Sequence, residues 1–341
     1  MDNVTFSFRK LILIFCFFGI FAATTQSKAE FKIIELPQQY DPILNQSFDI
    51  IPFSLVTTHD DLVYVSMQLG VRAYKISTGE FIKEITFPRS NKLCSYGLQN
   101  PNKIELSQDE KYLFVQAKCE ILQVDIKTNT IQKVLFTLGE DGSATHSFAV
   151  SPDQSLLAVS TSHCIACIWD LKTNKLLVQF IPGFDKFGDL KFSSDSKMLL
   201  IAGRNMWFRS TNKLIKFKPY IKDIVLNNAG YVIEFLSNNK SFISAGVDRD
   251  VLQKNSITGD VIVRYKNGVR TDAFALSPDE KLLATGSYGD LKVRLFSVKT
   301  GKLLKVFEGH TKLIDTLVFS KDNKKLISGS PDQTIYIWNL N

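Results

Sequence analysis

Residues that build catalytic and metal sites are scarce in this sequence of 341 residues. Its four histidines are scattered at positions 59, 146, 163 and 310, whereas a closed zinc site needs four grouped ligands. Motifs of the forms Gly-x-x-x-x-Gly-Lys, His-Glu-x-x-His and Gly-x-Ser-x-Gly are absent, as is a dinucleotide-binding glycine fingerprint. The sequence therefore predicts no metal site, no cofactor and no enzymatic activity.

Helical periodicity is also missing after the first thirty residues. The segments Val293–Phe296 and Thr334–Trp338 instead alternate apolar and polar residues with the period of a β-strand. This pattern predicts an all-β protein.

A short dipeptide, Thr followed by Gly or Asn, recurs between apolar runs. Successive copies are 50, 45, 38, 47 and 42 residues apart, near the ~40 to 45 residues of a four-stranded propeller blade. Gly and Asn tolerate the positive φ of a two-residue hairpin, so each copy is expected to form one. The copies are Thr78-Gly79, Thr128-Asn129, Thr173-Asn174, Thr211-Asn212, Thr258-Gly259 and Thr300-Gly301.

A second repeated turn gives the number of repeats. Seven polar turns of the form Ser/Thr-x-Asp, or close to it, follow apolar strands, and their composition is that of type I turns. They begin at Thr58, Ser107, Ser151, Ser193, Ser237, Ser277 and Ser320. We therefore predict a seven-bladed β-propeller of four-stranded antiparallel blades.

The two ends of the repeat region are expected to meet. The last repeat reaches Trp338 and ends without an outermost strand, whereas Phe31–Leu36 reads as a strand with no blade of its own. Pairing this segment with the last blade would complete its four strands and cover an exposed edge.

Residues 1–29 differ from the repeats and read as a secretory signal. Arg9 and Lys10 precede an apolar run of 13 residues, Leu11–Ala23, and Ser27-Lys28-Ala29 resembles a cleavage site. The run is shorter than the ~20 residues of a membrane-spanning helix, although an uncleaved anchor stays open. We expect residues 30–341 to form a single propeller domain in the periplasm or outside the cell.

Four cysteines remain after removal of the signal, and an even number in an exported protein favours disulfides. The repeat register places Cys94 and Cys119 on one face of the second repeat, so a Cys94–Cys119 bond is the first choice. Cys164 and Cys167 have redox spacing, but they enter a strand rather than the start of a helix.

The last repeat resembles the WD40 repeat family. It contains Gly309-His310, Phe319-Ser320-Lys321-Asp322, Ser328-Gly329-Ser330-Pro331-Asp332 and Trp338-Asn339, and Trp169-Asp170 keeps the family dipeptide. The resemblance implies a buried structural network in which Asp332 orients His310, His310 meets Ser328, and Ser328 accepts from Trp338. In the sixth repeat, Val269 stands near the histidine position.

The resemblance implies a divergent, exported bacterial member of this family. Its expected function is a non-enzymatic scaffold that binds protein partners as a monomer. Lysines spread over the outer strands favour a solvated surface over nucleic-acid binding, and association with an envelope surface stays open. The alternative is a quinoprotein-like or lactonase-like propeller, an enzyme or redox protein with a ligand over the central channel.

Overall fold

Residues Phe31–Asn341 form one compact unit. The structure, a computed structural model, describes residues 31–36, 39–41, 46–48, 51–67, 70–87, 103–117, 120–137, 145–161, 164–180, 187–203, 205–210, 226–227, 232–246, 249–287 and 289–340. The predicted signal, with its cleavage site after Ala29, lies outside these residues. No helix in the described ranges is both long and apolar enough to cross a membrane.

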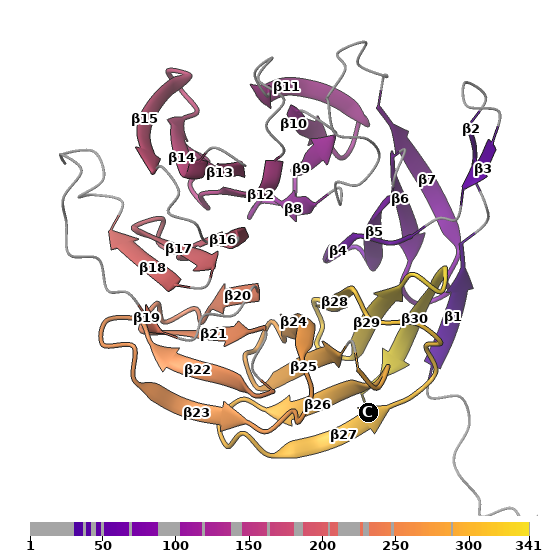
Figure 1. Cartoon of the computed structure of the whole chain (residues 1–341). Coiled ribbons are helices and arrows are strands. Elements are labelled where there is room, and N and C mark those ends of the chain that lie inside the picture. The colour runs from indigo at the N-terminus through magenta and orange to yellow at the C-terminus, as the bar shows by residue number, and fades with distance from the viewer. Residues whose placement is uncertain are drawn as a thin grey trace, which may run out of the picture. The chain divides into compact units, whose positions relative to one another are not determined.

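The regular elements of the described residues are β-strands, and they form antiparallel four-stranded blades around a common centre (Figure 1). Six blades each use four consecutive strands. Blade 1 contains β4 (Ser54–Thr57), β5 (Leu62–Met67), β6 (Gly70–Lys75) and β7 (Phe81–Thr86). Blade 2 contains β8 (Ile104–Leu106), β9 (Tyr112–Ala117), β10 (Glu120–Asp125) and β11 (Thr130–Thr137). Blade 3 contains β12 (Thr145–Val150), β13 (Leu156–Thr161), β14 (Cys164–Asp170) and β15 (Lys175–Phe180). Blade 4 contains β16 (Phe187–Phe192), β17 (Met198–Gly203), β18 (Asn205–Ser210) and β19 (Leu226–Asn227). Blade 5 contains β20 (Val232–Phe235), β21 (Ser241–Ala245), β22 (Val251–Asn255) and β23 (Val261–Tyr265). Blade 6 contains β24 (Thr271–Leu276), β25 (Leu282–Ser287), β26 (Val293–Ser297) and β27 (Leu303–Phe307).

A further four-stranded sheet, the closing blade, joins the two ends of the repeat region. It consists of β28 (Thr316–Phe319), β29 (Lys325–Ser330), β30 (Thr334–Asn339) and β1 (Phe31–Glu35). The seven predicted repeats thus correspond to six blades of consecutive strands and the closing blade. A separate two-stranded sheet pairs β2 (Gln39–Asp41) with β3 (Gln46–Phe48).

Strand β1 is the outermost strand of the closing blade, as the sequence predicted. It runs antiparallel to β30 with Phe31 opposite Trp338. The Leu36 N–H donates to the Gln333 carbonyl at 2.8 Å and extends the pairing to the predicted end of the segment. Ile34 is buried in a core that combines residues of the closing blade and blade 1. The prediction that Phe31–Leu36 completes the last blade is confirmed.

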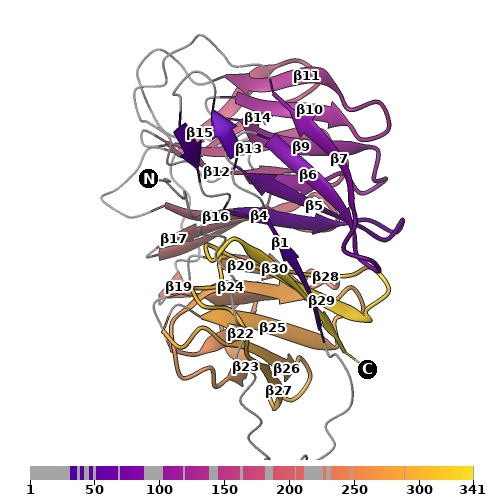
Figure 2. The same cartoon turned by 90° about the vertical axis from the view of Figure 1, so that its right-hand side faces the viewer.

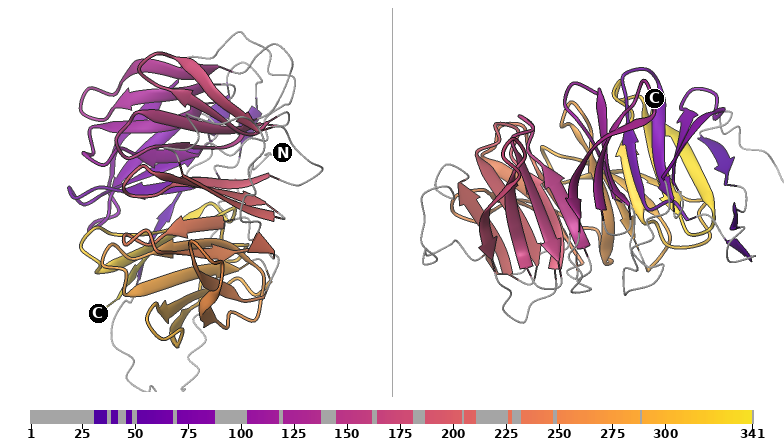
Figure 3. Two further views of the ribbon diagram at one scale, coloured as in Figure 1. Left: turned by 90° about the vertical axis from the view of Figure 1, so that its left-hand side faces the viewer. Right: turned by 90° about the horizontal axis from the view of Figure 1, so that it is seen from above.

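The hydrophobic core lies between blades, which pack face to face (Figures 2 and 3). Every core cluster in the described residues draws its members from two neighbouring blades. For example, Phe114 of blade 2 packs with Phe148 of blade 3, and Phe274 of blade 6 packs with Leu236 of blade 5. A chain that buries its apolar residues in this way needs no single large core.

The Thr-Gly and Thr-Asn hairpins are longer than predicted. Gly79 has a φ of 76°, as expected, but its N–H donates to the Lys75 carbonyl at 2.7 Å. The Lys75 N–H donates in turn to the Glu80 carbonyl, so four residues separate the paired ends. The prediction of two-residue loops was wrong because positive φ is needed here at the last of four loop residues. Asn212 lies outside the described residues.

In blade 3 the Asp of the Trp-Asp dipeptide caps this loop. Asp170 Oδ1 accepts hydrogen bonds from the N–H groups of Lys172 and Thr173, at 2.9 and 2.7 Å. These bonds, led by the one from Thr173, lower the pKa of Asp170. A side-chain acceptor at the strand end therefore fixes the turn locally.

The second turn type joins the first and second strands of each blade. In the closing blade, Ser320 Oγ donates to Asp322 Oδ1 at 2.6 Å and accepts from the Lys325 N–H at 2.9 Å. In blade 5 the equivalent turn begins at Leu236, one residue before the predicted Ser237. The fourth residue of each turn has positive φ: Asp61, Glu110, Gln154, Ser196, Asn239, Glu280 and Asn323.

Five of these positive-φ residues also link neighbouring blades. Each side chain accepts a hydrogen bond from a backbone N–H in the turn of the preceding blade. The pairs are Glu110 with His59, Ser196 with Asp153, Asn239 with Ser194, Glu280 with Ser237, and Asn323 with Asp279. The turns therefore hold the blades in register at one face.

Candidate functional site

The four residues of the predicted network meet in the closing blade. His310, between β27 and β28, places Nδ1 2.9 Å from Asp332 Oδ2 and Nε2 2.8 Å from Ser328 Oγ. The Trp338 indole N–H donates to Ser328 Oγ at 2.9 Å. The side chain of His310 is 0% exposed and that of Asp332 is 6% exposed.

The direction of these hydrogen bonds follows from the donors. Because the Trp338 indole only donates, Ser328 accepts there and its own proton is left for His310 Nε2. His310 Nδ1 then carries the proton that is donated to Asp332. Burial opposes ionisation of Asp332, but hydrogen bonds from His310, Thr334 and the Thr311 N–H outweigh it and hold its pKa far below the usual range.

This geometry suits a structural role. Ser328 is 0% exposed, whereas a serine nucleophile must reach its substrate. Asp332 also accepts from the Thr311 N–H at 2.8 Å, which fixes the segment before β28 to the β29–β30 turn. The arrangement holds a loop against its blade.

We expect His310→Ala to lower the free energy of unfolding by about 1 to 3 kcal/mol, because Asp332 and Ser328 lose buried hydrogen bonds. Urea unfolding followed by tryptophan fluorescence measures this change. His59→Ala is the matched control, because His59 also contacts a carboxylate, Glu110 at 2.8 Å, but its side chain is 75% exposed. Unchanged stability of the His310 variant together with loss of partner binding would contradict the structural role.

Blade 6 contains a related network that sequence reasoning missed. Asn267, not Val269, takes the place of the histidine: Thr285 Oγ1 donates to Asn267 Oδ1 at 2.9 Å. The Asn267 amide donates to Thr271 Oγ1 at 2.7 Å. Asn267 lies 43 residues before His310, which is one repeat, so counting back one period would have identified it.

Blade 3 keeps its Trp-Asp dipeptide without the same connection. The Trp169 indole N–H is buried and has no hydrogen-bond partner in the described part of the chain. His163, at the family's Asp position, is outside the described residues. Val159 stands at the Ser328 position, and the next residue, Ser160, accepts from the Ser147 N–H at 3.0 Å.

A second polar group, the inner ion cluster, lies on innermost strands of blades 2, 4 and 5. It consists of Lys103, Glu105, Asp189, Lys191 and Glu234. Lys103 Nζ is 2.6 Å from Asp189 Oδ1 and 3.2 Å from Glu105 Oε1. Lys191 Nζ is 3.3 Å from Glu234 Oε2 and 3.8 Å from Glu105 Oε1.

The inner ion cluster also connects to blade 3. Lys103 Nζ donates to Ser147 Oγ at 3.0 Å and to the Phe148 carbonyl at 2.7 Å. Glu105 Oε2 accepts from the Val150 N–H at 3.1 Å. One set of side chains therefore bridges the innermost strands of four consecutive blades.

Burial and pairing set the pKa values in the cluster. Burial would raise the pKa of Asp189, but Lys103 and Lys191 outweigh it and lower the value. For Glu234, burial outweighs the attraction of Lys191, so its pKa is raised. The pKa of Lys191 is raised because three carboxylates overcome its burial.

The charged side chains of the cluster are engaged with one another. Its cations and carboxylates bind one another, and Lys103 fills its donor capacity with serine, carbonyl and carboxylate oxygens. Within the described ranges, no set of three or more His, Cys, Asp or Glu side chains is arranged to hold a metal.

The predicted Cys94–Cys119 pair lies outside the described residues. Cys167, on β14, is disulfide-bonded. The repeat register pointed to Cys94 and Cys119 instead, because register alone does not determine disulfide connectivity.

Comparison with known proteins agrees with the geometry. The family described as "WD domain, G-beta repeat" matches residues 301–339, which include the whole network around His310. Residues 301–339 therefore match the WD40 repeat. The four-stranded blades in the rest of the described chain have the propeller architecture that this repeat builds.

The chain is also similar to longer WD-repeat proteins. Pre-mRNA-processing factor 17 of Homo sapiens is 26% identical over 153 residues, which cover 44% of this chain and 24% of that protein. Periodic tryptophan protein 2 of Saccharomyces cerevisiae is 31% identical over 87 residues, 23% of this chain and 9% of that protein. Protein ROOT INITIATION DEFECTIVE 3 of Arabidopsis thaliana is 46% identical over 59 residues, 17% of this chain and 13% of that protein. The chain thus spans a quarter or less of these relatives.

Proposed function

We propose that this protein is a non-enzymatic scaffold whose ring of blades presents its loops to a protein partner. The observation that carries this proposal is that the side chains of its two polar groups, the His310 network and the inner ion cluster, bind one another. His310 is buried in a closed network, and the two lysines of the inner ion cluster are paired with the carboxylates of the same cluster. A WD40 repeat within a propeller supports the same function, because WD40 propellers generally act as scaffolds.

The alternative of a cofactor or substrate over the centre receives less support. Such a ligand needs convergent polar groups that are free to bind it. The polar atoms of the inner ion cluster are instead already in use: Lys103 binds Glu105 and Asp189, and Glu105 also accepts a hydrogen bond from blade 3. We therefore propose a seven-bladed ring, counting the closing blade, that binds through surface loops.

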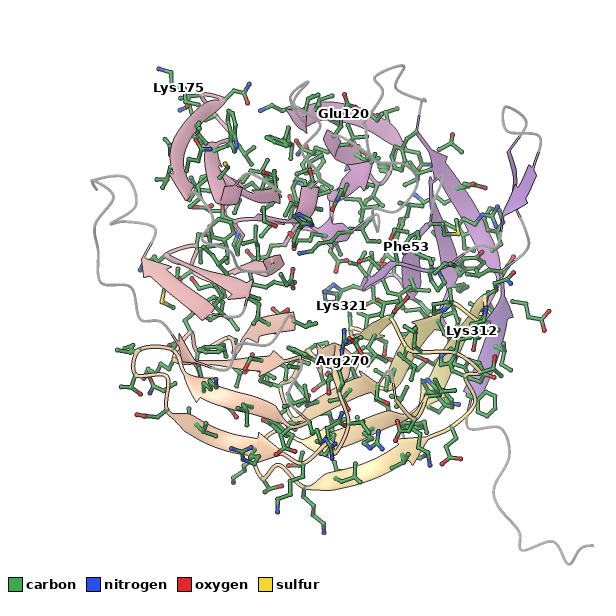
Figure 4. The ribbon with its side chains drawn as sticks, viewed as in Figure 1. Phe53, Glu120, Lys175, Arg270, Lys312 and Lys321 are labelled. Carbon is green, nitrogen blue, oxygen red and sulfur yellow. The ribbon has the colours of Figure 1, made fainter. Side chains whose placement is uncertain are left out.

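Binding is tested by affinity capture from the native envelope fraction with paired charge reversals. Lys312 and Lys324 are both exposed, and they lie at opposite ends of β28. Lys312 precedes the strand, and Lys324 lies in the turn between β28 and β29 (Figure 4 labels Lys312). A scaffold that binds through one face should lose its partner in only one of Lys312→Glu and Lys324→Glu. Absence of any protein enriched over a heat-unfolded control would contradict the proposal.

We further propose that the protein is exported and that the mature chain begins at Glu30, as a monomer. The basis is the apolar run Leu11–Ala23 followed by Ser27-Lys28-Ala29. N-terminal sequencing of protein purified from the cell envelope should give Glu30-Phe31-Lys32. A purified chain that retains Leu11–Ala23 would contradict cleavage and indicate an anchor.

A further inference from the structure

The outermost strands of five blades share a β-bulge at the same position. In blades 1, 2, 3, 5 and 6, two residues of the outermost strand stand opposite one residue of the strand beside it. In blade 6, Leu303 pairs with Phe296 and Lys305 pairs with Leu295, so Leu304 is the extra residue. The extra residues are Ile82, Gln132, Leu177, Ile262 and Leu304. All but Gln132 are large and apolar.

The bulges of blades 5 and 6 present apolar side chains to solvent. Ile262 is 53% exposed and Leu304 is 50% exposed. The residue before each of them is exposed as well, Val261 in blade 5 and Leu303 in blade 6. Single exposed apolar residues are ordinary on a protein surface, whereas apolar pairs at matching positions of adjacent blades indicate a contact surface.

These two apolar pairs lie next to each other. The loop before β27 packs against β23, since a Cβ atom on Gly301 would lie 2.7 Å from the Arg264 carbonyl oxygen. The two strands are neighbouring outermost strands along the lower edge of the ring (Figure 1). We call the surface that they form the outer patch, and its apolar members are Ile257, Val261, Ile262, Leu303 and Leu304.

The surroundings of the outer patch are basic. The segments 255–265 and 297–307 contain the basic residues Arg264, Lys299, Lys302 and Lys305 and the acidic residue Asp260. Arg264 pairs with Asp250 of its own blade at 3.0 Å. Lys299 and Lys302 are exposed and form no ion pair among the described residues, so their charges are available to an external anion.

The residue types of the outer patch fit a lipid surface better than a protein surface. Centres of protein interfaces are enriched in Trp, Tyr and Arg and depleted in Lys, whereas this patch exposes Ile, Leu and Val beside Lys. Addition of a partner strand is disfavoured, because a bulge interrupts the hydrogen-bonding edge. Proteins that lie on membranes combine aliphatic side chains at the acyl boundary with lysines that reach the headgroups.

We propose that the outer patch binds the surface of an anionic lipid bilayer. Ile262 and Leu304 enter the boundary between headgroups and acyl chains, and Lys299 and Lys302 bind lipid phosphate groups. Each lysine close to an anionic membrane strengthens binding by roughly fivefold. This contact is additional to the protein scaffold, and its test needs no protein partner.

Sedimentation with lipid vesicles tests the proposal. The test uses the chain from Glu30 onwards, because residues 31–341 form one compact unit and the apolar run Leu11–Ala23 would bind lipid by itself. Wild type should bind vesicles that contain phosphatidylglycerol roughly 25-fold more tightly than vesicles of phosphatidylcholine alone, and added salt should reduce this preference. Equal binding to both vesicles would overturn the proposal. Binding to neither would also overturn it and leave a protein as the occupant of the patch.

Two double variants separate the apolar and the charged parts of the contact. Ile262→Gln combined with Leu304→Gln should weaken binding to phosphatidylglycerol vesicles by roughly tenfold, because two half-exposed side chains no longer gain from burial. Lys299→Glu combined with Lys302→Glu should abolish the preference for phosphatidylglycerol. All four side chains are exposed, so both variants should melt with wild type.

Blade 2 supplies the matched control. Ile131 and Lys127 occupy the equivalent strand and loop on the opposite, upper edge of the ring, and both are exposed (Figure 1). Ile131→Gln combined with Lys127→Glu should therefore bind vesicles like wild type. Undiminished binding of both outer-patch variants, or an equal loss in the blade 2 variant, would overturn the proposal.

Discussion

Deletion of Phe31–Leu36 is expected to produce the largest loss of stability of any change considered, with aggregation of the purified protein. The deletion removes Ile34 and Leu36 from the core shared with blade 1, at ~1.5 to 3 kcal/mol for each buried side chain. It also removes the ring contact between Phe31 and Trp338, whose centroids are 5.1 Å apart. Strand β30 would then present an unpaired edge, which favours association between chains.

Thermal unfolding and static light scattering measure the two effects of the deletion. Point variants supply the matched control, because Ile33 and Ile34 are neighbours on β1 but Ile33 is 47% exposed and Ile34 is 6% exposed. We expect Ile34→Ala to cost about 2 to 5 kcal/mol and Ile33→Ala much less. Equal effects of the two variants, or unchanged melting after the deletion, would show that β1 does not close the ring.

Replacement of Lys103 by Met is expected to lower the free energy of unfolding by about 3 kcal/mol at pH 7. The change leaves Asp189 and Glu105 without the cation that lies 2.6 and 3.2 Å from them. It also removes the donor to the Phe148 carbonyl, which connects blades 2 and 3. Chemical unfolding in urea, with the slope compared between variants, measures the loss.

The pH dependence of the Lys103 variant provides an internal check. In wild type the pKa of Asp189 is lowered, so its contribution is present above the unfolded value near 4 and is lost at lower pH. Without Lys103 the buried carboxylates favour protonation. The difference in the free energy of unfolding between variant and wild type should therefore become smaller from pH 7 to pH 4. Lys133→Met is the control, because Lys133 donates to the Leu171 carbonyl and has no carboxylate partner in the described residues. A gap independent of pH would contradict the ion pairing.

Local chemistry explains what the sequence revealed. Turn residues recur once per blade and act on their immediate neighbours, so their spacing predicted the repeats and the unfinished last blade. The network of His310, Ser328, Asp332 and Trp338 lies within one repeat, and its contacts follow from the residue types and their register. Positive φ at Gly79 was predictable in the same way, but the length of its loop was not, because φ at one residue does not fix the paired ends.

The inner ion cluster shows what sequence reasoning missed. Its residues come from three blades, and their side chains meet only because the ring places the innermost strands side by side. A signal was present: Glu105 and Lys191 each stand two residues before the serine that begins a turn. Glu234 occupies the same place before Leu236 once the turn of blade 5 is shifted by one residue. If the turn of blade 5 is taken to begin at Ser237, Glu234 no longer aligns with Glu105 and Lys191 in the repeat register.

The pairing of β1 with β30 has a consequence for the biosynthesis of the protein. The first strand of the repeat region emerges from the ribosome early, but its partner is made roughly 300 residues later. Closing a loop of this length is slow and entropically costly, so early blades must wait with an open edge while the remaining strands are synthesised. A chain cut short before Trp338 would never find the partner of Phe31, and premature termination should therefore yield a product that is cleared rather than a smaller working ring.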